Sequence, residues 1–188
     1  MTRDGVEGES GEKGASRETQ NESRVSRKSR QASIRIIGLG NEFRGDDAVG
    51  LLAARRLRGQ VGLRAEVIEA PMAGVELLEL MKGASVALLI DATSCGQAPG
   101  TIHRLDASSG PIAPELFPRS THAIGVAEAI ELARTLGVLP PKVIVYGIEA
   151  AHMETGHPLS PHVVHALNEV VQLVLQEIQP RACMNSIS

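Results

Sequence analysis

The amino-acid sequence predicts an α/β fold, a three-layer α/β/α sandwich with a mostly parallel, about five-stranded sheet. From Ser33 onward, short apolar segments alternate with longer segments whose apolar residues recur at helical spacing. This alternation is typical of a parallel sheet covered by helices. The uninterrupted apolar run from Val86 to Ile90 supports it, because a strand without polar positions is covered on both faces.

The first half of the pattern is regular. Its predicted elements are a strand over roughly 34–39, a helix over 46–58, a strand over 64–69, a helix over 74–82 and a strand over 86–90. In the first helix, Val49, Ala53 and Leu57 share one face, which we expect to be buried.

The second half contains more breaks. A weaker strand over 101–105 leads into a proline-containing loop, and Ser120-Thr121 is predicted to cap a helix that runs to about Leu136. A last strand over 142–148 and a last helix over 161–178 follow, with Pro161 suited to the first turn of that helix.

The chain of 188 residues is predicted to hold one folded domain, residues 34–180. Residues 1–33 carry seven Lys/Arg and six Asp/Glu among small polar residues. Such a segment buries too little apolar surface to offset the entropy of ordering, so we expect a disordered charged extension. Residues 181–188 are expected to form a flexible C-terminus.

Composition excludes several classes of function. The formal net charge of −3 and the lack of a basic patch argue against a nucleic-acid partner. No window reaches the roughly 20 apolar residues of a membrane span, and no apolar signal segment is present. The two cysteines, Cys95 and Cys183, lie far apart, which suits a reducing compartment. We expect a cytoplasmic protein without a membrane partner, and a monomer.

A glycine-rich segment after the first strand, residues 38–50 (GLGNEFRGDDAVG), is the most informative motif. A dinucleotide fingerprint would place glycine where Phe43 stands, and a phosphate loop would place Lys-Ser/Thr where Asp46 and Asp47 stand. Two acids at a strand-to-helix turn repel an anion. The segment therefore predicts a cation near the carboxyl edge of the sheet.

Three side chains are expected to share that edge. Asp47 follows the first strand, Asp91 ends the third, and His122 begins the helix after the proline loop. The first and third strands of a doubly wound sheet are commonly neighbours at the switch point, so these side chains could converge. Two oxygen donors and one nitrogen donor suit a divalent first-row metal.

Each of these residues also has a purely structural interpretation. Asp46 is a natural N-cap, Asp47 a favourable first-turn acid, and His122 a polar residue at a helix start. Asp91 could simply end its strand, although a carboxylate after five apolar residues is costly unless it is paired or bound.

The remaining cysteine, serine and histidine residues give weaker evidence of a functional site. Cys95 lies in a Ser-Cys-Gly turn without an identifiable base, so a cysteine hydrolase has no support, and no serine-hydrolase elbow is present. Three histidines are expected to be solvated surface residues: His103, His162 and His165. Two others, His152 and His157, flank a loop at the carboxyl edge and could line a substrate groove.

Residues 34 to about 178 resemble the hydrogenase maturation protease family, endopeptidases that remove the C-terminal extension of the nickel-iron hydrogenase large subunit once nickel is in place. Four blocks carry the resemblance: Gly38-Leu39-Gly40-Asn41 with Gly45-Asp46-Asp47-Ala48-Val49-Gly50; Ala73-Gly74-Val75-Glu76-Leu77-Leu78; Ile90-Asp91-Ala92 with Pro99-Gly100-Thr101; and Ser120-Thr121-His122-Ala123-Ile124-Gly125.

The resemblance implies roles for individual residues. Asp47, Asp91 and His122 match the residues that contact metal, and Asp47 and Asp91 are the expected catalytic acids. Asn41 and Glu69 are assigned, with His122, to substrate binding. Asp47 stands where relatives often have Glu, and Pro71 stands in a segment where relatives commonly have glycines.

Two hypotheses about function follow. The first is a cytoplasmic endopeptidase that processes the immature nickel-iron hydrogenase large subunit, with nickel carried by that substrate rather than resident in the protease. The second is a nickel-dependent checkpoint or chaperone that binds the same precursor without cutting it.

Overall fold

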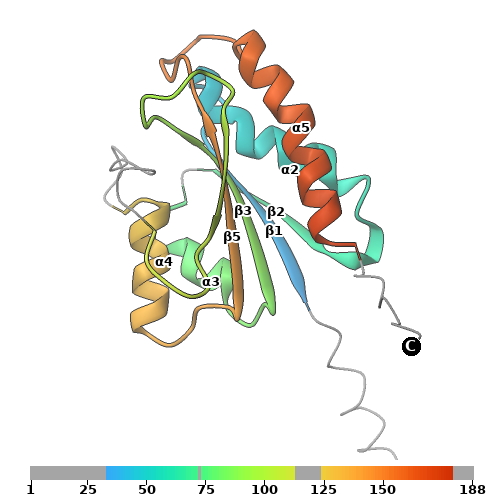
Figure 1. The fold of residues 1–188 in the computed structure, drawn as a ribbon, viewed down its shortest axis with the longest axis vertical. Helices are drawn as coiled ribbons and strands as arrows, with labels where there is room; N and C mark the ends of the chain where they lie inside the picture. Colours follow the sequence, from blue (N-terminus) through green and yellow to red (C-terminus); the bar gives the residue numbers. More distant parts are fainter. Residues whose placement is uncertain (1–32, 72, 113–123, 180–188) are drawn as a thin grey trace, which may run out of the picture. The chain divides into compact units, whose positions relative to one another are not determined.

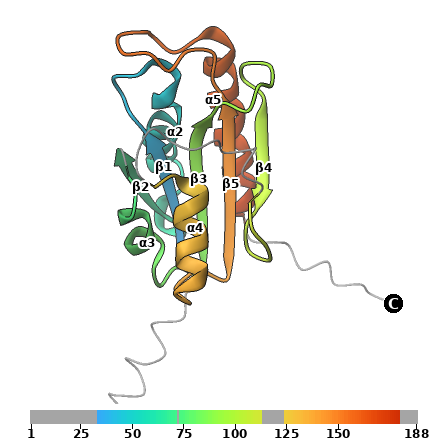
Figure 2. The same ribbon diagram turned by 90° about the vertical axis from the view of Figure 1, so that its left-hand side faces the viewer.

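In the part of the chain that the structure describes, five strands form one sheet in the order β2-β1-β3-β5-β4. The computed structural model describes residues 33–71, 73–112 and 124–179, so the predictions for residues 1–32 and 181–188 lie outside the described residues. The strands are β1 (Ile34–Gly40), β2 (Glu66–Pro71), β3 (Val86–Thr93), β4 (Ile102–Asp106) and β5 (Lys142–Glu149). All neighbours pair in parallel except β4, which is antiparallel to β5 (Figure 2). The prediction of a mostly parallel, five-stranded sheet is confirmed.

Helices cover both faces of this sheet (Figure 1). They are the 3-10 turn η1 (Gly45–Ala48), α2 (Val49–Arg58), the 3-10 turn η2 (Gly62–Arg64), α3 (Glu76–Met81), α4 (Val126–Thr135) and α5 (Pro161–Glu177). The helices α2 and α5 pack on one face, and α3 and α4 on the other (Figures 1 and 2). The predicted three-layer sandwich is therefore confirmed, and none of the helices in the described ranges is long and apolar enough to cross a membrane.

Alternating strand residues divide the interior into two cores. In β5, Ile144, Tyr146 and Ile148 join the core under α2 and α5. Val143 and Val145 join the core under α3 and α4. Successive side chains of a strand point to opposite faces of the sheet. Asp91 in β3 and Glu149 in β5 are also odd-numbered, so their side chains lie on the same face as Val143 and Val145, the face that α3 and α4 cover.

The chain switches direction across the sheet at β1. After β1 it builds β2 on one side, and it then returns to place β3 on the other side of β1. The carboxyl ends of β1 and β3 therefore flank the switch point, which is where open α/β sheets form their binding crevice.

Two predicted boundaries were wrong. The helix expected from Ser120-Thr121 begins at Val126, because Gly125 is extended and its N–H donates to Oε2 of Glu128 at 3.1 Å. The strand expected over 64–69 covers Glu66–Pro71. A proline is tolerated at that position because β2 is an edge strand.

Candidate active site

The turn after β1 is built by glycines that let two backbone segments touch. Gly40 has a φ of +127°, and a Cβ on it would overlap the carbonyl oxygen of Asp47. A Cβ on Gly50 would overlap the carbonyl oxygen of Ile90 in β3. The glycine pattern of the sequence motif thus brings the start of α2 against β1 and β3.

Asp47 lies in this turn, and its neighbours hold its backbone. Its carbonyl accepts a hydrogen bond from the N–H of Asn41 at 3.1 Å, and its N–H donates to the carbonyl of Arg44 at 3.0 Å. Its side chain is 18% exposed, with Oδ2 at 3.7 Å from Nη1 of Arg44. Asp47 therefore presents a fixed, partly solvated carboxylate at the carboxyl edge of the sheet.

Asp91 lies on the neighbouring strand and interacts with Asp47. Its Oδ1 accepts the N–H of Ala92 at 2.9 Å. Burial, and after it the negative charge of Asp47, raise the pKa of Asp91 from 3.8 to about 8. At neutral pH the pair therefore holds one negative charge and one proton. The structure brings these two predicted site residues together, as the sequence pattern indicated.

Asp46 has a different role from the N-cap that the sequence suggested. Its side chain is fully buried and accepts four hydrogen bonds, from the N–H groups of Ala151, His152 and Ser160 and from the Ser160 hydroxyl, at 2.7 to 3.0 Å. Burial alone would raise the pKa of Asp46, but these hydrogen bonds outweigh it and lower the pKa. Asp46 fastens the turn that carries Asp47 to the loop before α5.

The remaining predicted site residues are only partly described. His122 lies outside the described residues; Ile124, two positions later, has its carbonyl beside Gly74. The Oδ1 of Asn41 accepts the N–H of Phe43 at 3.0 Å. Glu69 pairs with Arg55 at 2.7 Å and with Arg58 at 2.9 Å, so two cations from α2 balance its charge. A role of these residues in substrate binding stays a prediction.

The loop between β5 and α5 carries the two histidines that were expected there. The rings of His152 and His157 are exposed, with their centroids 5.7 Å apart. This loop is held to the Asp47 turn by the hydrogen bonds of Asp46 and by a bond from Nε of Arg44 to the carbonyl of Met153 at 3.0 Å. That these rings line a substrate groove stays a prediction.

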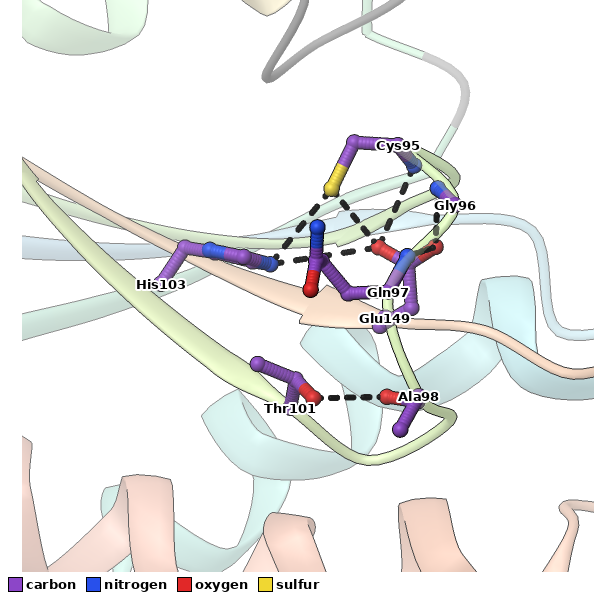
Figure 3. A network of polar contacts seen from close by, with 7 residues as sticks. All are labelled: Cys95, Gly96, Gln97, Ala98, Thr101, His103 and Glu149. Atoms are coloured by element: carbon purple, nitrogen blue, oxygen red, sulfur yellow. Dashed lines mark hydrogen bonds and ion pairs between the residues drawn. The ribbon is translucent and has the colours of Figure 1, made fainter.

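One cluster was missed by sequence reasoning. The expectations that Cys95 has no identifiable base and that His103 is a solvated surface residue were wrong. The Sγ of Cys95 lies 3.5 Å from Nε2 of His103 and 3.0 Å from Oε2 of Glu149, and the His103 side chain is only 17% exposed (Figure 3). The one available signal was Glu149 itself, a carboxylate directly after seven strand residues that contain no acid.

The chain matches known proteins over most of its length. Residues 51–177 match the HycI family model, described as hydrogenase maturation protease. The hydrogenase 2 maturation protease of Escherichia coli K12 is 28% identical over 151 residues, which cover 78% of this chain and 90% of that protein. The hydrogenase expression/formation protein HupD of Thiocapsa roseopersicina is 23% identical over 76% of this chain, but the match spans only 66% of the HupD protein.

Solved structures agree with the fold. The hydrogenase maturating endopeptidase HybD from Escherichia coli superposes with a TM-score of 0.67 at 25% identity, covering 78% of this chain and 91% of that one. An endopeptidase from Escherichia coli solved in solution has a TM-score of 0.68 at 27% identity, covering 77% and 90%. The protease names of these proteins do not favour the non-hydrolytic alternative. With its sheet order, its acid pair at the switch point and a family match over two thirds of its residues, the chain belongs to the hydrogenase maturation protease family.

Proposed function

We propose that this protein is the endopeptidase that removes the C-terminal extension of an immature nickel-iron hydrogenase large subunit after nickel insertion. The observation that carries the proposal is the coupled pair of Asp47 and Asp91 at the switch point between β1 and β3, in a chain of this peptidase family. The reaction takes place in the cytoplasm, and the protein acts as a monomer.

Nickel enters this scheme as part of the substrate. A precursor that already holds nickel presents a cation to Asp47, Asp91 and His122, whose oxygen and nitrogen donors suit a divalent first-row metal. A cation favours the ionised form of a nearby carboxyl, so nickel would displace the proton that Asp91 holds at neutral pH. A precursor without nickel offers no such exchange, so Asp91 keeps its proton beside the negative charge of Asp47.

Hydrolysis requires a group that takes a proton from water. Once the cation has displaced its proton, the ionised carboxylate of Asp91 can accept a proton from water, and we assign this role to Asp91. The water oxygen bonds to the carbonyl carbon of the scissile peptide, the carbon–nitrogen bond breaks, and the departing amine takes up the proton. Asp47 stays ionised and holds the cation near the reacting carbonyl.

Substrate contacts are assigned to groups around the pair. Asn41 directly follows β1, and Glu69 lies near the carboxyl end of the edge strand β2; we assign both residues to binding of the precursor chain. Phe43, in the same turn as Asn41, is 68% exposed, and an apolar segment of the precursor would bury it.

The test is incubation of the purified protein with nickel-loaded and nickel-free precursor, followed by mass spectrometry of the large subunit. Loss of the C-terminal peptide only from the nickel-loaded precursor is the expected result. Binding of that precursor without cleavage would overturn the assignment as a protease. Equal cleavage of both forms would show that the enzyme does not sense nickel.

A further inference from the structure

Three ligand-type side chains converge where β3, β4 and β5 meet, in a cluster that the proposed cleavage does not use. Cys95 follows β3, His103 is the second residue of β4, and Glu149 ends β5. Sγ to Nε2 measures 3.5 Å, Sγ to Oε2 3.0 Å, and Nε2 to Oε2 3.9 Å (Figure 3). Within the described ranges, no other set of three His, Cys, Asp or Glu side chains converges in this way.

The spacing fits one metal ion. Zinc bonds of about 2.3 Å to sulfur and about 2.0 to 2.2 Å to nitrogen and oxygen place tetrahedral ligand atoms roughly 3.3 to 3.6 Å apart. The three observed separations of 3.0, 3.5 and 3.9 Å bracket that range. Shifts of a few tenths of an ångström would complete one face of a tetrahedron and leave the fourth position open.

The carboxylate of Glu149 is already held in place. Its Oε1 accepts the N–H groups of Gly96 and Gln97 at 2.8 and 3.1 Å, and its Oε2 accepts the N–H of Cys95 at 3.1 Å (Figure 3). Hydrogen bonds of this kind fix the orientation of a metal-binding carboxylate and strengthen its site. All three come from the Cys95 loop, so the loop and the carboxylate form one unit.

The thiol and the imidazole complete the arrangement. The thiol of Cys95 donates to Oε2 of Glu149, and that hydrogen bond raises the pKa of the thiol. His103 brings its Nε2 from a different strand to 3.5 Å from Sγ of Cys95 and 3.9 Å from Oε2 of Glu149. Cys95 and His103 are half-buried, which leaves a path for an ion.

We propose that Cys95, His103 and Glu149 bind one zinc-type divalent ion, in a site separate from Asp47 and Asp91. The ion takes the place of the thiol proton: a bond forms between the metal and Sγ, the S–H bond breaks, and the proton passes to solvent. Oε2 and Nε2 supply the second and third bonds, and water completes the fourth position. The ion ties together the ends of three strands and fixes the loop between β3 and β4.

The experiment titrates the metal-stripped, full-length protein with cobalt(II), whose bond to a thiolate gives a near-ultraviolet charge-transfer band, and then with zinc. The expected result is one cobalt bound with that band, displacement by zinc, and a higher melting temperature with zinc. Cys95→Ser keeps a hydroxyl donor for Glu149 but loses the thiolate, so it should abolish the band and weaken zinc binding roughly 100-fold or more. His103→Gln should weaken binding without removing the band.

Two controls separate this site from others. Cys183→Ser removes the other cysteine, and Asp47→Asn alters the proposed nickel contact; both should keep the cobalt band and the gain in melting temperature. Equal melting temperatures of metal-free wild type and Cys95→Ser would show that the variant is folded. Absence of the band in the wild type, or its loss in Cys183→Ser, would overturn the proposal. Cleavage assays play no part in this test. The metal site can therefore be confirmed or refuted whether or not the proposed protease function is correct.

Discussion

Asp91 interacts with Asp47 across the junction of β1 and β3: burial, and after it the negative charge of Asp47, raise the pKa of Asp91 to about 8. Asp47 comes from the turn after β1, and Asp91 comes from the strand beside it. Because Asp91 holds its proton beside the negative charge of Asp47, it can release that proton when a cation arrives.

Replacing Asp91 by asparagine should abolish processing while the fold persists. Burial and the charge of Asp47 raise the folded pKa from 3.8 to about 8. The protonated Asp91 therefore makes a contribution to the free energy of unfolding that is fully present below about pH 4 and is lost as pH rises through about 8. Asparagine does not ionise, so Asp91→Asn should gain several kcal/mol over wild type between pH 4 and pH 9, because each tenfold change in an acid constant corresponds to about 1.4 kcal/mol.

Urea unfolding at a series of pH values measures that difference. His165→Ala, a change on the exposed side of α5, is the control and should alter neither activity nor the pH profile. A variant that melts lower at every pH and keeps its activity would make Asp91 a structural residue.

Asp47→Asn should slow cleavage by orders of magnitude and, in the same protein, lower the pKa of Asp91. The amide keeps the size of the side chain but removes the charge that opposes ionisation of Asp91. Carbon-13 NMR of the Asp91 carboxyl, followed against pH, gives the pKa directly. Glu79→Gln, which alters only an exposed pair with Lys82, serves as the control. An unchanged Asp91 titration would mean that the two carboxyl groups are not coupled.

Asp46→Ala should destabilise the protein by about 3 kcal/mol or more, because three backbone N–H groups and one hydroxyl lose their acceptor. Asp106→Ala is the matched control: its exposed carboxylate accepts the Ser108 N–H at 2.9 Å, and its loss should cost about 1 kcal/mol or less. Chemical denaturation compares the two. Similar losses of unfolding free energy in both variants would show that Asp46 does not stabilise the turn more than an exposed aspartate does.

Acid should reveal the same contribution of Asp46. Its hydrogen bonds outweigh burial and keep its pKa below 3.8. The stability it supplies is therefore present above about pH 4 and is lost as pH falls through the lowered pKa. The difference in unfolding free energy between wild type and Asp46→Ala should shrink in that acid range.

A chain that begins at Ser33 should fold and cleave as the full protein does. The segment before Ser33 is rich in charged and small polar residues and contains too few apolar residues to build a core. Ser33 itself must stay, because its carbonyl accepts the N–H of Ser85 at 2.9 Å and its hydroxyl donates to Gly83 at 3.2 Å. Melting temperature and cleavage rate of the shortened chain test this. A drop in either would assign a working role to the extension.

The sheet and the acid pair could be predicted because their signals are local. Apolar runs locate β1, β3 and β5, and parallel strands bring the residues at their carboxyl ends to one edge. Asp47 and Asp91 follow directly from that rule. The start of α4 was missed because Glu128 satisfies the N–H of Gly125, whereas sequence reasoning gave the cap to Ser120 or Thr121.

The cluster of Cys95, His103 and Glu149 could not be predicted, because it depends on the direction of one strand. In a parallel β4, the early residue His103 would lie at the opposite edge of the sheet. The strand runs antiparallel to β5 and pairs His103 with Gly147, which brings the imidazole to the carboxyl ends of β3 and β5. Sequence periodicity reports which residues are buried but not which way an edge strand runs.

The bracing contacts of Asp46 also bear on when the enzyme becomes competent during its synthesis. The carboxylate leaves the ribosome early, but its partners, Ala151, His152 and Ser160, follow more than a hundred residues later. Until they emerge, the Asp46 side chain lacks the hydrogen bonds that hold the Asp47 turn to the loop before α5. A nascent chain of this protein therefore has no finished cleavage site until Ser160 has been translated and has left the ribosome.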